Sequence, residues 1–494
     1  LPIWVDDGRK SFAMSVDAAG GQGGKLYADH KKIYPIAVSG FFRRLKWAIL
    51  IVGMAIYYLL PFVRWDRGPG QPDQAVLLDL PARRFYFFFI EIWPQEVYYV
   101  TGLLIVSAFV LFLMNALAGR VWCGYLCPQT VWTDLYLAVE RLVEGADRRS
   151  RQKLDEARWS LSKLGRKAAK HALWILIAWG TGGAWVLYFA DAPTLVKDLA
   201  TLQAPAAAYM WIAALTFSTY LLAGFAREQV CIYMCPWPRI QAALTDEWAY
   251  NVSYRVDRGE PRGSLKTNRK LRAEGQPAGD CVDCGQCVAV CPTGTDIRKG
   301  MQLSCIQCGL CIDACDTVMA KTGQAPRLIA YDNDINIERR EKGLADVHKF
   351  VRPRTILYVV LIAGICGLMA WKLGTRATIG LNVLHDRNPQ YVLNSDGSVR
   401  NGYTLRLLNK DPKARDLGLT IDGVPADSRL ETVSEAGRDG SALILRVDGD
   451  QTREIRVIVT VPAKDKLANS QDVTFRLSAP DGEKIHTQDF FKAP

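Results

Sequence analysis

Residues 281–292 read CVDCGQCVAVCP and residues 305–315 read CIQCGLCIDAC, and these two stretches decide how the chain is interpreted. They contain eight of its thirteen cysteines. Each has the spacing C-x2-C-x2-C-x3-C, with which bacterial ferredoxins hold [4Fe-4S] clusters. Because the whole pattern occurs twice, it predicts an α+β, bacterial-type ferredoxin domain with two [4Fe-4S] clusters.

The spacing also predicts which cysteines share a cluster. Three cysteines two residues apart let a tight loop surround three corners of a cubane, while the fourth points away and binds the other cluster. Gly285 and Gly309 follow the second cysteine of each loop, where backbone amides must come close to inorganic sulfide. Asp316 stands where a second proline is usual, so the spacing does not predict the conformation of the turn after Cys315. The predicted ligand sets are crossed: Cys281, Cys284, Cys287 and Cys315 for one cluster, and Cys305, Cys308, Cys311 and Cys291 for the other.

Two structural zinc sites are the alternative, since paired C-x2-C elements also bind zinc. Zinc requires neither the third cysteine nor the fourth at this spacing, and both stretches have them. A disulfide framework is disfavoured, because cysteines this dense beside basic loops indicate a reducing, cytoplasmic face.

The composition is that of a multi-domain membrane protein. At 494 residues the chain is too long for one ordinary domain. The net charge of +11 does not predict nucleic-acid binding, because Lys and Arg cluster beside long apolar runs and no nucleic-acid-binding motif occurs. The first residues, LPIWVDDGRKSF, lack the apolar core and cleavage site of a removable signal peptide.

Five apolar stretches are predicted to cross the membrane as helices. The last would be about 28 Å long, which fits a hydrocarbon core of roughly 30 Å. Five spans would place the two ends of the chain on opposite sides. The stretches are residues 47–63, 97–117, 172–189, 206–225 and 355–373.

Loop charges predict the orientation of these spans. The loop of residues 119–170 is rich in Lys and Arg, whereas the loop between the third and fourth spans has only Lys197. By the positive-inside rule, the arm of residues 1–46, the 119–170 loop and the ferredoxin domain of residues 227–354 are cytoplasmic, and residues 374–494 are periplasmic. We therefore expect a protein of the bacterial inner membrane. Four cations on the predicted outer side run against the rule: Arg64, Arg67, Arg83 and Arg84.

Residues 374–494 differ in character from the rest. Short runs of alternating apolar and polar residues, such as 403–408 and 454–461, are divided by turn signals such as Asp481-Gly482. The pattern predicts an all-β sandwich of immunoglobulin type. It contains no cysteine and no catalytic constellation, so we expect it to contact a periplasmic partner.

Two further cysteine pairs follow predicted spans. Cys123 and Cys127 lie in RVWCGYLCPQTVW, and Cys231 and Cys235 lie in REQVCIYMCPWPR, so both elements read C-x3-C-P. If they are helical, the i, i+4 spacing puts each pair on one face. The proline after each second cysteine can kink or end the helix.

Several interpretations of these four cysteines compete. Free cysteines often serve only as small packing residues, but the same pattern at two equivalent positions argues against packing alone. A disulfide within a pair conflicts with the reducing face. A thiolate site for a soft metal remains, either Cu(I) or an additional iron–sulfur centre. We therefore predict that these cysteines form a redox or metal site.

Other residues are less informative. Cys366, within the last predicted span, is expected to pack in the core, and His385 to be a surface or hydrogen-bonded residue. Glu91 and Glu96 could relay quinol protons, although solvated carboxylates are the preferred interpretation. The basic segment 141–170 is predicted to lie on anionic lipid.

Taken in order, the two C-x3-C-P elements, the ferredoxin segment, a further span and the β-rich tail closely resemble the cytochrome c oxidase accessory protein family, the FixG/CcoG-type membrane-bound polyferredoxins. The resemblance covers nearly the full length, including HDRNPQYV at residues 385–392 and NGYTLRLLNK at residues 401–410. It implies a role in assembling cbb3-type cytochrome c oxidase, as a reductase that converts Cu(II) to Cu(I) for copper delivery. Oxidase-assembly or copper-handling proteins would then be partners.

The predicted chemistry is consistent with that role. Clusters carry single electrons, and thiolates such as those of Cys123, Cys127, Cys231 and Cys235 stabilise Cu(I). The electron donor and the oligomeric state, including a homo-oligomer, stay open. Two alternatives also stay open: a quinol-linked electron conduit similar to the membrane ferredoxins of periplasmic nitrate reductase, and a non-redox assembly scaffold.

Overall fold

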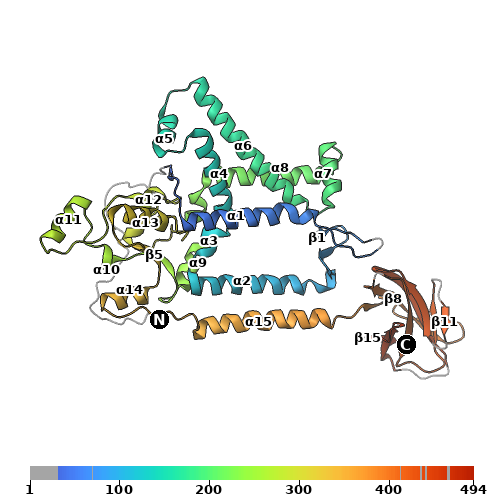
Figure 1. Cartoon of the computed structure of the whole chain (residues 1–494). Helices are drawn as coiled ribbons and strands as arrows, with labels where there is room; N and C mark the ends of the chain where they lie inside the picture. Colours follow the sequence, from blue (N-terminus) through green and yellow to red (C-terminus); the bar gives the residue numbers. More distant parts are fainter. Residues whose placement is uncertain (1–31, 69–70, 412, 434–436, 440–441, 464–467) are drawn as a thin grey trace, which may run out of the picture.

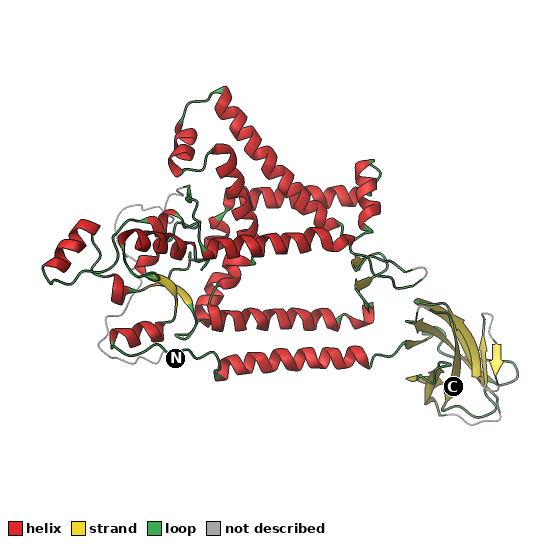
Figure 2. Cartoon of the chain, viewed as in Figure 1, coloured by secondary structure: helices red, strands yellow, loops and turns green. Residues whose placement is uncertain are grey.

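The computed structural model describes residues 32–68, 71–411, 413–433, 437–439, 442–463 and 468–494. Three parts follow one another along the molecule (Figure 1). A domain of short helices and two strands lies at one end, long helices form the middle, and a β-sandwich lies at the other end (Figure 2). Most of the predicted N-terminal arm lies outside the described residues.

Four helical segments of the described chain are long and apolar enough to cross a membrane. They run side by side between the two end domains (Figure 1). The last, α15 (Pro353–Gly374), has no buried residue in its apolar stretch, as a lipid-facing helix requires. The other three are Phe41–Phe62, made of α1 (Phe41–Leu59) and η1 (Leu60–Phe62); Pro94–Ala118, made of η2 (Pro94–Glu96) and α2 (Tyr98–Ala118); and Ala206–Ala226, made of α8 (Ala206–Leu221) and η3 (Leu222–Ala226).

The prediction of five spans is therefore wrong, and the count among the described residues is four. The predicted span at 172–189 falls on α6 (Leu161–Val186), whose first half is basic. Lys167 and Lys170 pair there with Glu144 of α4 (Pro128–Glu144), at 2.7 and 2.9 Å. The apolar half of α6 packs on α8, where a β-carbon at Gly182 would lie 2.9 Å from the carbonyl oxygen of Ile212. One side of this half thus serves helix packing, whereas Leu176 and Trp179 on the other side are 58% and 56% exposed.

The ferredoxin-like domain is α+β, as predicted. Strands β4 (Asn251–Tyr254) and β5 (Ile329–Asp332) pair antiparallel, and both cysteine stretches lie between them. Its core is formed by Val252, Ile312 and Ile329, with cysteines packed against them. The helices of the domain are α10 (Val256–Gly259), α11 (Leu265–Ala273), α12 (Gln286–Ala289), η5 (Ile297–Lys299), α13 (Leu310–Thr322) and α14 (Asp334–Glu341).

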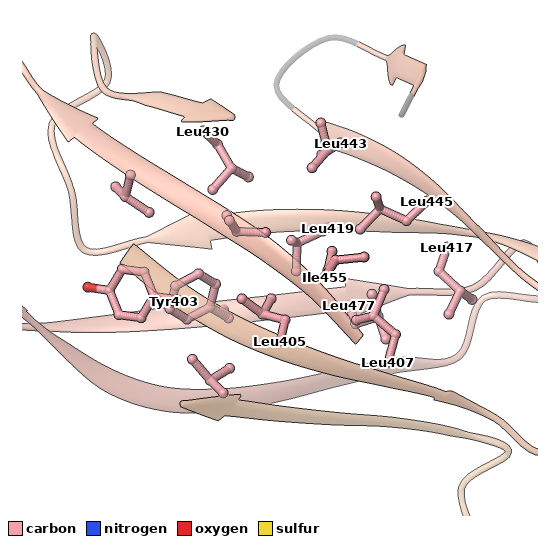
Figure 3. Packing of buried hydrophobic residues seen from close by; sticks show 14 of the residues in the cluster. Tyr403, Leu405, Leu407, Leu417, Leu419, Leu430, Leu443, Leu445, Ile455 and Leu477 are labelled. Carbon is pink, nitrogen blue, oxygen red and sulfur yellow. The ribbon is translucent and has the colours of Figure 1, made fainter. Parts of the chain in front are cut away.

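The C-terminal part is the predicted immunoglobulin-like sandwich of two antiparallel sheets. Every second residue of a strand points into its core, as Tyr403, Leu405 and Leu407 of the strand 399–409 do, and these three are fully buried (Figure 3). One sheet has the order β10-β13-β8-β6, with β7 beside β8: β10 (Arg429–Thr432), β13 (Gln451–Val461), β8 (Val399–Asn409), β6 (Ile379–His385) and β7 (Val392–Leu393). The other has the order β11-β12-β9-β14-β15: β11 (Gly437–Asp439), β12 (Ala442–Val447), β9 (Arg415–Asp422), β14 (Ser470–Ser478) and β15 (Lys484–Lys492).

A small antiparallel sheet of β1 (Val76–Asp79), β2 (Arg84–Phe87) and β3 (Ile90–Ile92) precedes α2 and contacts the sandwich. Glu96 is 4 % exposed and pairs with Lys410 of the sandwich at 2.6 Å, so the prediction of a solvated carboxylate is wrong. Two of the four cations that contradicted the positive-inside rule are paired with acids. Arg64 binds Asp73 and Asp191, and Arg84 lies 3.1 Å from Glu91.

Candidate functional site

Two cavities in the ferredoxin-like domain are bordered by the predicted ligand sets. One is lined by Cys281, Cys284, Cys287 and Cys315. The other is lined by Cys291, Cys305, Cys308 and Cys311, with Cys287 also bordering it. The crossed pairing therefore brings each fourth cysteine to the cavity of the opposite loop.

The backbone of the two loops repeats the same unusual conformation. Asp283 and Gly285 have positive φ of 50° and 64°, and Gln307 and Gly309 have 55° and 74°. Such left-handed residues curve successive N–H groups into a concavity that binds anions, including iron–sulfur groups. Gly309 also lacks room for a side chain, because a β-carbon there would lie 2.7 Å from the ring of Phe42. Both the backbone conformation of the loops and the positions of their cysteines therefore fit a cubane.

The electrostatics of the cavities also fit a cluster. Burial raises the pKa of Cys305 and of Cys315 to about 12, and that of Cys287 to about 11. Buried thiolates grouped in this way need a cationic centre to be stable. A [4Fe-4S] cluster bound by either set would supply storage of single electrons.

The missing second proline has a structural consequence. Helix α13 continues past Cys315 and ends at Thr322. A proline at position 316 would lie inside this helix and would kink or break it. Asp316 accepts a 2.7 Å hydrogen bond from the backbone N–H of Arg327. The chain after Cys315 therefore continues as a helix and does not form a turn.

The two C-x3-C-P elements are repeats of one structure. Each follows a spanning helix through a left-handed residue, Gly119 (φ 54°) in the first and Arg227 (φ 42°) in the second. A short turn then carries the first cysteine: α3 (Val121–Tyr125) holds Cys123, and η4 (Val230–Met234) holds Cys231.

The second cysteine of each element is extended. Cys127 has ψ 126° and Cys235 has ψ 124°. A new helix then begins, α4 at Pro128 and α9 (Trp237–Leu244) directly after Pro236. The helix therefore ends before the second cysteine. The expectation that an i, i+4 helical face holds each pair is wrong, and the expectation that proline ends the helix is confirmed.

Reciprocal hydrogen bonds hold the two elements together. Gln129, just after the first element, donates to the carbonyl oxygens of Leu222 and Arg227 at 2.9 and 3.1 Å. Gln241 of α9 accepts from the thiol of Cys123 at 3.5 Å. The four thiols lie near one another, since those of Cys127, Cys231 and Cys235 add to the burial that raises the pKa of Cys123 to about 12.

The first element also lies directly on the ferredoxin-like domain. The Tyr125 hydroxyl donates a 3.0 Å hydrogen bond to the carbonyl oxygen of Cys308. The Arg120 guanidinium donates to the carbonyl oxygens of Leu303 and Pro238, at 2.7 and 2.9 Å. Arg120 thus joins the second cysteine loop to the start of α9.

A third, small cavity lies between the second element and the same loop. Cys231, Lys46 and Arg227 line it on one side, and Thr293 and Ile306 line it on the other. Thr293 follows Cys291 closely, and Ile306 lies between Cys305 and Cys308. The cavity therefore connects a thiol at the membrane edge to the loop that carries the predicted second ligand set.

No group of three His, Cys, Asp or Glu side chains among the described residues is arranged to hold a single metal ion. Cys366 is exposed on α15, so the prediction that it packs in the core is wrong. His385 bonds Asn401 at 2.8 Å, which confirms the prediction of a hydrogen-bonded residue.

Sequence reasoning missed the residues that join the parts. Asp313 accepts hydrogen bonds from the backbone N–H groups of Phe42 and Arg43, at 3.2 and 2.8 Å, and so caps α1 with a residue of α13. The side chain of Gln307 accepts from the N–H of Arg120 at 2.7 Å. These pairs are far apart in sequence, and no local pattern marks them.

Comparison with known proteins identifies the same parts. Residues 226–334 match a family described as a 4Fe-4S dicluster domain, residues 100–143 match a 4Fe-4S binding domain, and residues 369–494 match the Ig-like fold at the C-terminus of FixG. A FixG-related protein from Vibrio parahaemolyticus is similar to 24% of this chain and 96% of its own, with 18% identity and a TM-score of 0.20.

Two relatives match almost end to end. Nitrogen fixation protein FixG of Rhizobium meliloti is 47% identical over 95% of this chain and 93% of its own. Protein RdxB of Cereibacter sphaeroides is 48% identical over 95% of this chain and 98% of its own. The chain therefore belongs to the FixG family of iron–sulfur membrane proteins.

Proposed function

We propose that this protein is a cupric reductase that serves the assembly of cbb3-type cytochrome c oxidase. In this proposal the ferredoxin-like domain supplies single electrons, and Cu(II) is the substrate, reduced at or near Cys123, Cys127, Cys231 and Cys235. Each turnover adds one electron to one Cu(II) and yields Cu(I), which soft thiolates stabilise. A copper-handling or oxidase-assembly protein would take the product.

The observation that carries the proposal is the contact between Gly124 and the second cysteine loop. A β-carbon at Gly124 would lie 2.8 Å from the carbonyl oxygen of Ile306, so the turn that holds Cys123 touches the loop that holds Cys305 and Cys308. Electron transfer is favoured by such close packing, and no mobile linker separates the two parts. The cavity beside Cys231 gives a small ion a place next to the same loop.

The orientation and partners belong to the same proposal. Although α6 is not apolar enough to count as a span, it runs back beside α8, so the basic segment of residues 141–170 lies at the ferredoxin end of the helices (Figure 1). We place that end on the cytoplasmic side of a bacterial inner membrane and the sandwich on the periplasmic side. The electron donor would be a cytoplasmic reductant. The sandwich would contact a periplasmic partner.

The test measures copper reduction by full-length protein purified without oxygen. Pre-reduced protein is mixed with Cu(II), and Cu(I) is trapped by a chromogenic chelator. The double variant Cys231→Ser with Cys235→Ser should lose reduction while its cluster absorbance persists. Cys366→Ser removes a cysteine exposed on α15 and should reduce copper at the wild-type rate.

A second candidate comes from the match of residues 100–143 to a 4Fe-4S binding domain, which includes Cys123 and Cys127. These cysteines would then hold an additional cluster. Iron and acid-labile sulfide separate the two candidates, because two cubanes give about eight of each per chain and three give about twelve. Unchanged copper reduction in the double serine variant, with about eight iron, contradicts both.

A further inference from the structure

A groove of about 930 Å³ runs beside the start of α1, between that helix and α4. Its polar end is formed by Arg43, Arg44 and Arg141, and its apolar wall by Trp47, Ala48 and Ile51 of α1. It lies at the ferredoxin end of a spanning segment, Phe41–Phe62 (Figure 1).

The arginines of this groove outnumber the acidic groups that the described residues place against them. Arg43 donates to both carboxylate oxygens of Asp134, at 2.9 and 2.8 Å. Among the described residues, the Arg44 side chain bonds only the carbonyl oxygen of Gly40, at 3.4 Å. Within the described part of the chain, Arg141 has no hydrogen bond or ion pair, although it is half-buried. Two guanidinium groups thus face the groove without an acid of their own.

The environment of Arg141 makes an anion favourable there. Burial and the neighbouring cations Arg43 and Arg151 lower the pKa of its guanidinium, with Asp134 and Glu140 as the opposing charges. A phosphate oxygen would relieve this repulsion and supply the acceptor that a buried guanidinium requires. Arg is the side chain best suited to phosphate, since its planar fork binds two oxygens.

The wall of the groove distinguishes a lipid from a free anion. Ile51 is 60% exposed, and the neighbouring Val52 and Ile56 are 59% and 57% exposed along the same spanning helix. Trp47 lies under the guanidinium of Arg43 at 5.0 Å, a position typical of the headgroup level. An acyl chain can follow this apolar surface, whereas inorganic phosphate gains nothing from it.

We propose that the groove between α1 and α4 is a specific site for one anionic phospholipid, whose phosphate lies between Arg44 and Arg141 and whose acyl chain lies along α1. Arg141 also borders a smaller cavity with Val290 and Pro292, which flank Cys291. The bound headgroup therefore covers the approach to the second cysteine loop from the membrane surface.

The test uses full-length protein in nanodiscs that contain phosphatidylethanolamine with a small share of phosphatidylglycerol. The protein is then extracted in mild detergent, and the retained lipid is identified and counted by mass spectrometry. Wild-type protein should retain phosphatidylglycerol in stoichiometric amount and exclude phosphatidylethanolamine. Arg44→Gln with Arg141→Gln should weaken retention roughly 30-fold, about fivefold for each guanidinium.

Two further variants keep the result interpretable. Arg149→Gln removes an exposed cation of α5 (Arg148–Glu156), outside the groove, and should retain lipid as wild type does. Ala48→Trp fills the groove without changing its charge and should lose the lipid. Equal retention in the double glutamine variant and wild type overturns the proposal, and so does displacement of the lipid by excess inorganic phosphate, which would indicate a free-anion site.

Discussion

The backbone of Gly124 lies directly against that of Cys308: a β-carbon at position 124 would come within 3.0 Å of the Cys308 α-carbon. The turn that carries Cys123 therefore rests on the second cysteine loop without a side chain between them. The atoms in contact are backbone atoms, which cannot move aside as the end of a flexible side chain can. The contact makes glycine a requirement at this position.

Replacing Gly124 by alanine should push the two elements apart. We expect a loss of stability of about 1–3 kcal/mol, because the added methyl group overpacks the contact, although alanine is otherwise favoured in a helix. Electron delivery to copper should fall at the same time. Thermal unfolding and the copper-reduction rate measure the two effects.

The matched control is Gly53→Ala in α1, where a β-carbon meets nothing within 4 Å. This substitution should leave both measurements unchanged or raise stability slightly. If Gly124→Ala behaves in the same way, the contact with Cys308 has no energetic importance.

Asp313 is the second point at which the ferredoxin-like domain is attached to the membrane helices. Its carboxylate accepts from the N–H groups of Phe42 and Arg43, which would otherwise have no partner at the start of α1. Asp313→Ala should cost about 1–2 kcal/mol, the usual effect of losing a helix cap. Asp313→Asn keeps an acceptor oxygen and should cost less.

Limited proteolysis of folded protein measures this attachment. Cleavage in residues 32–40, just before α1, should become faster in Asp313→Ala. Lys321→Ala, on the exposed end of α13, is the control and should be cleaved as slowly as wild type. Equal cleavage of all three proteins would show that other contacts fix α1.

The sequence was most informative where spacing alone defines the geometry. The grouping of Cys315 with the first loop could be predicted because cluster ligation restricts the spacing of cysteines within a few residues. The sandwich was predictable for a similar reason, since alternation has a period of two.

Packing partners were not predictable in the same way. The apolar half of α6 resembles a span, and only the structure shows that its Gly182 side packs on α8 and that Lys170 in its basic half pairs with Glu144. Likewise, Arg120 and Gln307 look like ordinary loop residues. Their importance depends on an interaction across 187 positions of sequence, which local patterns do not contain.

The ion pair between Glu96 and Lys410 fixes the sandwich against the start of α2. Both side chains are largely buried, with 5% and 12% exposed. Lys410→Met leaves the buried Glu96 carboxylate with only the N–H of Trp93 at 3.2 Å and Arg376 at 3.9 Å, so it should destabilise the docked sandwich by up to about 3 kcal/mol. Glu96→Gln together with Lys410→Met removes both charges and should recover most of this loss. Hydrogen exchange of α2 residues near Glu96 measures docking. If the double variant loses as much stability as the two single variants together, the two side chains do not form a stabilising pair.

Glu91 should make stability depend on pH. Burial and the nearby Asp450 raise the pKa of its carboxyl from 4.5 to about 7, despite Arg84 at 3.1 Å. The folded state therefore holds this proton more tightly than the unfolded chain. The stabilisation from this group is complete below pH 4.5 and is lost as the pH rises to about 7, a change of at most roughly 3 kcal/mol.

Glu91→Gln keeps the neutral form at every pH, so it should remove this part of the dependence and be more stable than wild type at pH 8. The measurement is the denaturant midpoint of full-length protein between pH 4.5 and 8, compared as the difference between variant and wild type. Glu454→Gln, at an exposed position of β13, should show no such difference. A constant difference between Glu91→Gln and wild type across this range would mean that Glu91 stays charged in the folded protein, held by Arg84.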